Sequence, residues 1–246
     1  MSATIPGLAH RGYPKRYPEN TIASFRAALA LSFRHLELDV HLTKDGVPVV
    51  IHDPTVNRTT NGTGFVKDYT LAELRKLDAG HGETIPTLEE VLLLAKGRAQ
   101  VDIELKQSGN LYAGLEEKVL ETVRACGMSD QVFVTSFDHY SIVRMRELSE
   151  ELELGLVLYG ATPSVFPLAR ELRARYISVK YIYLTDHFVR TCEEHGIQLI
   201  AWTVDDEADM RKLRSQYPQV WVCTNELERW KRCVEETGSH RSEVSL

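Results

Sequence analysis

Short apolar runs with the composition of β-strands alternate with helical patterns along the whole chain. This alternation is typical of βαβ units, in which a helix connects neighbouring parallel strands. Eight strands are predicted at residues 5–10, 35–42, 100–106, 132–137, 152–159, 176–179, 197–204 and 220–224. Eight strand–helix pairs in about 235 residues match the size of an α/β (β/α)8 TIM barrel, which we predict; a doubly wound open sheet is the competing architecture.

Helix start and stop signals separate the predicted strands. Thr21, Thr87 and Asp205 each stand just before a helical pattern, where their side chains can cap the helix N-terminus. Glu90 follows Thr87 by three residues, which is the spacing of a capping box. Gly127 comes just past an apolar-periodic stretch, as a glycine that closes a helix does. These signals support crossover helices between the strands.

One segment departs from this rhythm. Residues 47–51 form a second strand-like run only a few residues after the second predicted strand. Asp45-Gly46 between them is a strong hairpin turn signal. We therefore predict a hairpin after the second strand, within a small insertion at about residues 44–86 that includes a short helical piece at 71–77.

Length and composition favour one domain. The chain has 246 residues, of which 43% are hydrophobic and 26% charged, enough to bury a full core. We place a single barrel domain at residues 1–236. The polar segment 237–246 is expected to be a disordered tail.

Several functional classes are disfavoured. The net charge of −6 and the absence of a run of like charges argue against a nucleic-acid partner. No stretch reaches the roughly 18 apolar residues of a membrane span, and the N-terminus lacks a signal-peptide pattern, so we expect a cytoplasmic protein. The four cysteines lie far apart without a CxxC pair, as reduced thiols do. The oligomeric state is left open.

Two predicted strands carry acidic residues on one face. In the second strand, leucines and valine alternate with polar residues, so Glu37 and Asp39 share a face. The same alternation in the third strand groups Glu104 with Lys106. For an isolated strand, the ordinary explanation is a face turned to solvent. In a barrel, helices cover the outside, so this repeated polar face must point inward, where charges persist only when paired or bound to metal.

The inward carboxylates form a candidate cation site. Glu37, Asp39 and Glu104 could converge on one ion, and an all-oxygen set suits Mg²⁺ or Ca²⁺. Zinc is disfavoured because the sequence offers neither clustered thiols nor closely spaced histidine pairs. We predict one divalent cation, Mg²⁺ or Ca²⁺.

Histidines and cations follow the apolar runs. His10-Arg11-Gly12 ends the first run, where a guanidinium can bind phosphate oxygens and glycine permits close backbone approach. His52 ends the hairpin run, so the two imidazoles could act as acid and base. Lys106 could neutralise phosphate charge. A plain surface position for the first cluster, and a simple ion pair for Lys106, are the alternatives.

Trp202 ends the seventh predicted strand and could form a wall of the substrate pocket. A tryptophan at such a position is equally often a core residue. Phe137 and Tyr181 are weaker candidates for the same wall.

The chain resembles the glycerophosphodiester phosphodiesterases, particularly their compact bacterial cytoplasmic members. The resemblance rests on the segments HRGYPKRYPENTIASFRAAL, ELDVHLTKDGVPVVIHDPTVNRTTNGTG, TLAELRKLDAG, IPTLEEVL, DIELK and AWTV. It implies a (β/α)8 barrel with an insertion after the second strand, and hydrolysis of a small-molecule glycerophosphodiester to sn-glycerol 3-phosphate and an alcohol. Carried over by position, it implies three roles: ligation of Mg²⁺ or Ca²⁺ by Glu37, Asp39 and Glu104, acid–base catalysis by His10 and His52, and phosphate contact by Arg11 and Lys106.

Two positions depart from the family pattern. The link between Gly80 and Ile85 is short, where many members have a longer stretch with aromatic residues, so selectivity for the alcohol is open. Asn225 follows the eighth strand where the family often has aspartate, and this leaves the role of that loop open.

Three other functions remain as alternatives. A lysophospholipase D would use the same site on single-chain lysolipids, but it would need an apolar lip that the polar insertion does not suggest. A barrel lyase could use Lys106 or Lys180 as a Schiff-base amine. A non-catalytic scaffold is the third alternative, and it conflicts with the intact set of acid, base and ligand residues.

Overall fold

The computed structural model describes residues 5–243. Within this range, eight parallel strands form the barrel: β1 (Gly7–His10), β2 (His35–Leu42), β4 (Gln100–Leu105), β5 (Val132–Ser136), β6 (Glu153–Leu158), β7 (Tyr176–Lys180), β8 (Gln198–Trp202) and β9 (Trp221–Thr224). Each strand pairs in parallel with its neighbours, and β1 pairs with both β2 and β9, so the ring is closed. The predicted TIM barrel is confirmed and the open sheet is excluded. Several predicted strands are one to three residues too long, because apolar residues that flank the strands, such as Ile5, Phe137 and Val204, lie in the adjoining loops.

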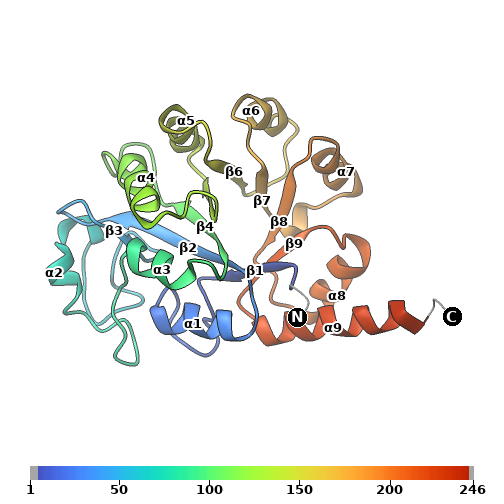
Figure 1. The fold of residues 1–246 in the computed structure, drawn as a ribbon, viewed down its shortest axis with the longest axis horizontal. Coiled ribbons are helices and arrows are strands. Elements are labelled where there is room, and N and C mark those ends of the chain that lie inside the picture. The colour runs from blue at the N-terminus through green and yellow to red at the C-terminus, as the bar shows by residue number, and fades with distance from the viewer. Residues whose placement is uncertain (1–4, 244–246) are drawn as a thin grey trace.

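Helices surround the ring of strands (Figure 1). In the described range they are α1 (Ile22–Ala30), α3 (Leu88–Ala95), α4 (Leu115–Cys126), α5 (His139–Leu148), α6 (Val165–Glu171), α7 (Asp186–Glu194), α8 (Glu207–Gln216) and α9 (Leu227–Glu243), with a 3-10 turn, η2 (Tyr181–Tyr183), after β7. The main core lies between strands and helices. Leu36, Leu38 and Val40 of β2 are fully buried there, so the alternating partners of these residues point into the barrel.

Helix caps follow the sequence signals with one exception. Thr21 accepts the Ser24 amide, and Thr87 forms a complete capping box with Glu90. Asp206, not the predicted Asp205, caps α8 by accepting two first-turn amides. The prediction was wrong because two neighbouring aspartates offer the same sequence signal. Only the side chain of the second accepts hydrogen bonds from the first-turn amides.

The predicted hairpin is present. β3 (Pro48–Val50) runs antiparallel to β2, and Gly46 takes a left-handed φ of 77° in the turn. The chain then forms η1 (Val66–Asp68) and α2 (Leu71–Leu74) beside β3, so the helical piece is shorter than predicted. A separate apolar cluster holds this region: Val49, Ile51, Val56, Val66, Leu74, Ala79 and Ile85.

The C-terminal helix α9 packs against the start of the barrel. Its fully buried Trp230 donates from Nε1 to the Pro6 carbonyl at 3.0 Å. The helix continues to Glu243, so most of the predicted tail at 237–246 is helical; its last three residues lie outside the described range. None of the helices in the described part combines the length and apolar composition that a membrane crossing requires.

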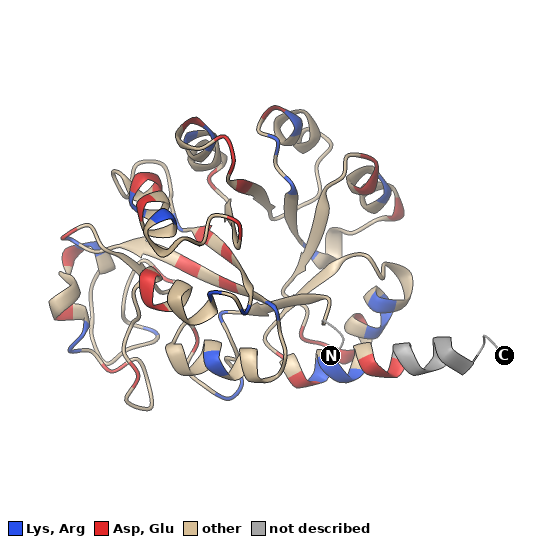
Figure 2. Ribbon diagram, in the orientation of Figure 1, with Lys and Arg blue, Asp and Glu red and all other residues tan. Residues whose placement is uncertain are grey.

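Charges are unevenly distributed over the ribbon. Lysine, arginine and acidic residues lie mainly on helices and loops, but acidic residues also lie along β2 and β4 inside the barrel wall (Figure 2). The register pairs Glu37 with Asp102, and Asp39 with Glu104. Acidic residues of the two neighbouring strands thus lie side by side, and the pair Asp39–Glu104 is two residues nearer the carboxyl ends than the pair Glu37–Asp102.

Candidate active site

A pocket opens at the carboxyl ends of the barrel strands. Every predicted site residue except Asp39 lines it: His10, Arg11, Glu37, His52, Glu104, Lys106 and Trp202. Asp39 is fully buried beside the pocket. These residues come from β1, β2, β4, β8 and the loops that follow β1, β3 and β4. The fold therefore brings the whole predicted set together.

The backbone after β1 is built for a tight turn. Arg11 has a left-handed φ of 56°, and Gly12 has a φ of 83°. A Cβ on Gly12 would lie 2.5 Å from Ser24 Oγ and 2.9 Å from the Phe25 amide, so only glycine fits. The turn directs Arg11 back over the barrel mouth.

Three carboxylates converge at this end. Glu37, Asp39 and Glu104 can each place one oxygen within 4.8 Å of the others. Lys106 Nζ lies 2.9 Å from Asp39 and 2.6 Å from Glu104. Lys106 and Arg11 are the two cations in contact with the cluster, so three carboxylates, when all are ionised, outnumber the cations by one.

Asp39 is the best-paired member of the cluster. Arg11 Nε lies 3.2 Å from its Oδ2, and the Asn20 amide donates to the same oxygen at 2.8 Å. Burial alone would raise the pKa of Asp39, but Lys106 and Arg11 outweigh burial and hold that pKa far below its usual range. Asp39 is therefore ionised.

Glu37 lies in a different environment. Its Oε2 accepts the Arg11 backbone amide at 2.9 Å, but its Oε1 is buried without a hydrogen-bond partner among the described residues. Burial raises the pKa of Glu37 well above its usual range, and the charges of Asp39 and Glu104 add to this effect. A buried carboxylate oxygen without a partner, next to two other carboxylates, fits a hard divalent cation.

His10 is held by its Nδ1 side. Its Nδ1 lies 2.8 Å from Asn225 Oδ1, and its Nε2 lies 4.0 Å from Glu37 Oε2. Burial, followed by the charge of Arg11, lowers the pKa of His10 to about 4. The imidazole is neutral at physiological pH, so one ring nitrogen keeps a lone pair.

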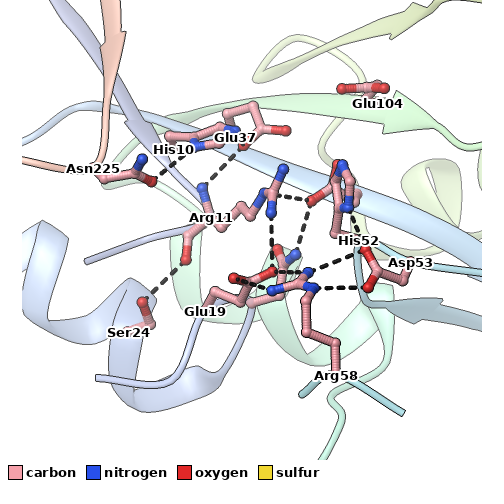
Figure 3. A network of polar contacts seen from close by, with 12 residues as sticks. His10, Arg11, Glu19, Ser24, Glu37, His52, Asp53, Arg58, Glu104 and Asn225 are labelled. Atoms are coloured by element: carbon pink, nitrogen blue, oxygen red, sulfur yellow. Dashed lines mark hydrogen bonds and ion pairs between the residues drawn. The ribbon is translucent and has the colours of Figure 1, made fainter. Parts of the chain in front are cut away.

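His52 has a charged partner instead. Its Nδ1 lies 2.7 Å from Asp53 Oδ1, and Arg58 holds Asp53 from Nε at 2.7 Å. Arg58 also pairs with Glu19, which accepts from Arg11 at 3.0 Å (Figure 3). Burial lowers the pKa of His52. One network thus connects the surroundings of both candidate catalytic histidines.

A second contact fixes the backbone at His52. His41, fully buried on β2, has its Nε2 2.9 Å from the His52 carbonyl and its Nδ1 2.7 Å from the Tyr112 hydroxyl. A carbonyl only accepts, so Nε2 carries the proton and the tyrosine donates to Nδ1. The hairpin and the loop after β4 are joined through this imidazole.

Aromatic rings form one wall of the pocket. The Trp202 ring packs edge-on against Phe137 and Tyr159, with ring centroids 5.6 Å and 6.2 Å away, respectively. Its indole Nε1 is buried without a hydrogen-bond partner in the described range. Lys180 Nζ lies 4.7 Å from the centroid of the Tyr159 ring. Trp202 therefore lines the pocket, and its contact with a substrate stays a prediction.

The family model described as "Glycerophosphoryl diester phosphodiesterase family" matches residues 10–229. The chain belongs to this family. It is a family of hydrolases.

Glycerophosphodiester phosphodiesterases of known sequence align over most of the chain. The one from Caldanaerobacter subterraneus subsp. tengcongensis is 42% identical, over 84% of this chain and 88% of the relative. The one from Bacillus altitudinis is 46% identical over 84% and 89%. A phosphodiesterase structure from Oleispira antarctica, in complex with the product sn-glycerol-3-phosphate, has a TM-score of 0.87 at 27% identity, covering 94% of this chain and 97% of that one.

Sequence reasoning gave no definite role at this glycerophosphoryl diester phosphodiesterase site to several of its polar residues: Glu19, Asn20, His41, Asp53, Arg58, Tyr112, Asp205 and Asn225. His41 and Asp53 carried a signal, since His41 follows Asp39 by two residues in the alternating strand and Asp53 comes directly after His52. The others lie in loops whose partners are distant along the chain. Their contacts could not be found from alternation or spacing.

Proposed function

We propose that the chain hydrolyses glycerophosphodiesters, such as glycerophosphocholine or glycerophosphoethanolamine, to sn-glycerol 3-phosphate and an alcohol, with one divalent cation, Mg²⁺ or Ca²⁺. One observation is the main support for the proposal. Three carboxylates converge beside two imidazoles, and one buried carboxylate oxygen, Oε1 of Glu37, has no hydrogen-bond partner in the described range. Family membership and the product named for the Oleispira antarctica structure support the substrate class.

Glu37, Asp39 and Glu104 are the proposed ligands of the cation. When bound, the cation neutralises charge on a phosphate oxygen. Arg11 and Lys106 line the same pocket and contact the remaining phosphate oxygens. Positive charge held in a water-poor pocket lowers the barrier most, because negative charge builds up on the phosphate oxygens in the transition state.

The two histidines divide the proton transfers. His10 takes the hydroxyl proton of the nucleophile as the new P–O bond forms, and His52 gives a proton to the alkoxide as the old P–O bond breaks. Their partners support this division: the charged Asp53 carboxylate favours a protonated His52 more strongly than the neutral Asn225 amide oxygen favours a protonated His10. The nucleophile is water, or the glycerol 2-hydroxyl to give a cyclic phosphate that water then opens.

A product assay tests the proposal. Purified chain is incubated with glycerophosphocholine, glycerophosphoethanolamine or lysophosphatidylcholine, with Mg²⁺, with Ca²⁺ or with EDTA, and sn-glycerol 3-phosphate and lysophosphatidic acid are quantified. We expect sn-glycerol 3-phosphate from the first two substrates, and its loss in EDTA. Faster release of lysophosphatidic acid would instead support the lysophospholipase D alternative. Full activity in EDTA, with no metal added, would contradict the role of the cation.

A further inference from the structure

A short chain of hydrogen bonds leads away from His10 along the rim of the barrel. His10 Nδ1 lies 2.8 Å from Asn225 Oδ1, and Asn225 Nδ2 donates to Asp205 Oδ2 at 2.7 Å. The three residues stand at the carboxyl ends of β1, β9 and β8, which are neighbours in the ring. From the sequence, the role of Asn225 was left open and Asp205 was predicted only as a helix cap, a position that Asp206 takes instead.

Hydrogen-bond chemistry fixes the direction of this chain of contacts. The Asp205 carboxylate can only accept, so the Asn225 amide nitrogen must face it and the amide oxygen must face His10. That oxygen also only accepts, so the proton of the neutral imidazole is on Nδ1. The lone pair is then on Nε2, the nitrogen that lies 4.0 Å from Glu37.

Asp205 is itself held in place. Its Oδ1 accepts from Thr224 Oγ1 at 3.0 Å and from the Asn225 backbone amide at 2.8 Å. The Arg229 guanidinium donates to its backbone carbonyl. With its carboxylate fixed by these contacts, Asp205 prevents the Asn225 amide from turning over.

We propose that Asn225 and Asp205 are positioning residues that hold His10 in the Nδ1-protonated tautomer, with its Nε2 lone pair available to accept a proton in the pocket. The proposal rests on the function proposed for His10. A histidine fixed in the opposite tautomer would present N–H to the nucleophile and could not act as a base.

The tautomer can be measured without turnover. In protein with ¹⁵N-labelled histidine, long-range ¹H–¹⁵N spectra distinguish a protonated ring nitrogen from one with a lone pair, and His10→Gln assigns the His10 signals. We expect Nδ1 of His10 to be protonated in the native chain. Asn225→Leu removes the acceptor, so we expect a shift toward the Nε2-protonated form and a kcat about 10- to 100-fold lower, with KM nearly unchanged.

Two further variants test the direction of the contacts. Asp205→Asn frees the Asn225 amide to turn, so we expect a mixture of His10 tautomers. Asn225→Asp combined with Asp205→Asn exchanges the two groups, and the new carboxylate at position 225 again accepts from Nδ1. We expect this pair to restore the native tautomer and to recover kcat relative to Asn225→Leu. Asn110→Leu, the same change at an exposed asparagine, serves as the matched control.

The outcomes separate this inference from the proposed function. An Nε2-protonated His10 in an active native chain would overturn the inference and leave the function intact. An Nδ1-protonated His10 that changes tautomer in Asn225→Leu would support the positioning even if none of the phosphodiesters were hydrolysed. If the native tautomer and kcat both survived in Asn225→Leu, Asn225 would have no positioning role.

Discussion

The two ends of the barrel interior are filled in opposite ways. At the amino ends of the strands, aromatic rings pack together: Phe133 stacks on Tyr176 with centroids 3.8 Å apart, and His35 lies 4.1 Å from Trp221. At the carboxyl ends, carboxylates and cations occupy the same cross-section. β2 contributes to both layers, since His35 begins the strand and Asp39 lies four residues further towards its carboxyl end.

This difference separates what stabilises the fold from what binds ligands. Burying aromatic rings favours folding through removal of apolar surface from water. Gathering three carboxylates within 4.8 Å of one another opposes folding, and the two cations in contact with them, Lys106 and Arg11, offset this repulsion only in part. The amino end should therefore control stability, and the carboxyl end should control cation binding and turnover. Three substitutions test this division.

The largest effect is expected at the carboxyl end, from Glu104→Ala. Cation binding and hydrolysis should be lost together, because a cation supplies several kcal/mol of charge stabilisation, about 10³-fold or more in rate. The free energy of unfolding in EDTA should change little, because Lys106 keeps its contact with Asp39. Calorimetric titration with Mg²⁺ or Ca²⁺, a sn-glycerol 3-phosphate assay and urea unfolding provide the three measurements.

Glu151→Ala is the matched control, because Glu151 is exposed. It should leave cation affinity, rate and stability unchanged. Full activity in Glu104→Ala would disprove the proposed ligand set.

At the amino end, Phe133→Ala should lower the free energy of unfolding by about 3 to 5 kcal/mol, because it removes a fully buried ring and leaves a cavity. Urea denaturation gives the change. The protein that remains folded should bind the cation with native affinity. A loss of less than about 1 kcal/mol, or a specific loss of cation binding, would show that the two ends are not separate in this way.

The barrel could be predicted from the sequence because its signals are local. Strand alternation, the Thr87 capping box and the Asp45-Gly46 turn each depend on residues a few positions apart, and all three are present. An error arose where two neighbouring residues offered the same local signal, as with the helix cap at Asp206.

The candidate site could be predicted only in part, for a related reason. Glu37, Asp39 and Glu104 are recognisable because charges on one face of a covered strand are costly without a function. The residues that orient the histidines give no such signal. His10 and Asn225 are 215 positions apart, and their contact exists only because the barrel closes between β1 and β9. Such partners need the three-dimensional structure.

The smallest expected effect comes from Tyr112→Phe, which should lower both the free energy of unfolding and the turnover rate. This variant leaves Nδ1 of the buried His41 without its donor, which should cost about 1 kcal/mol of stability. It also loosens the imidazole that holds the His52 carbonyl, so kcat should fall about fivefold while cation affinity stays native. Urea unfolding, steady-state kinetics and cation titration measure the three quantities. If kcat is unchanged while stability falls, Tyr112 and His41 only stabilise the fold. The residues that control turnover would then include His52 but not the contacts behind it.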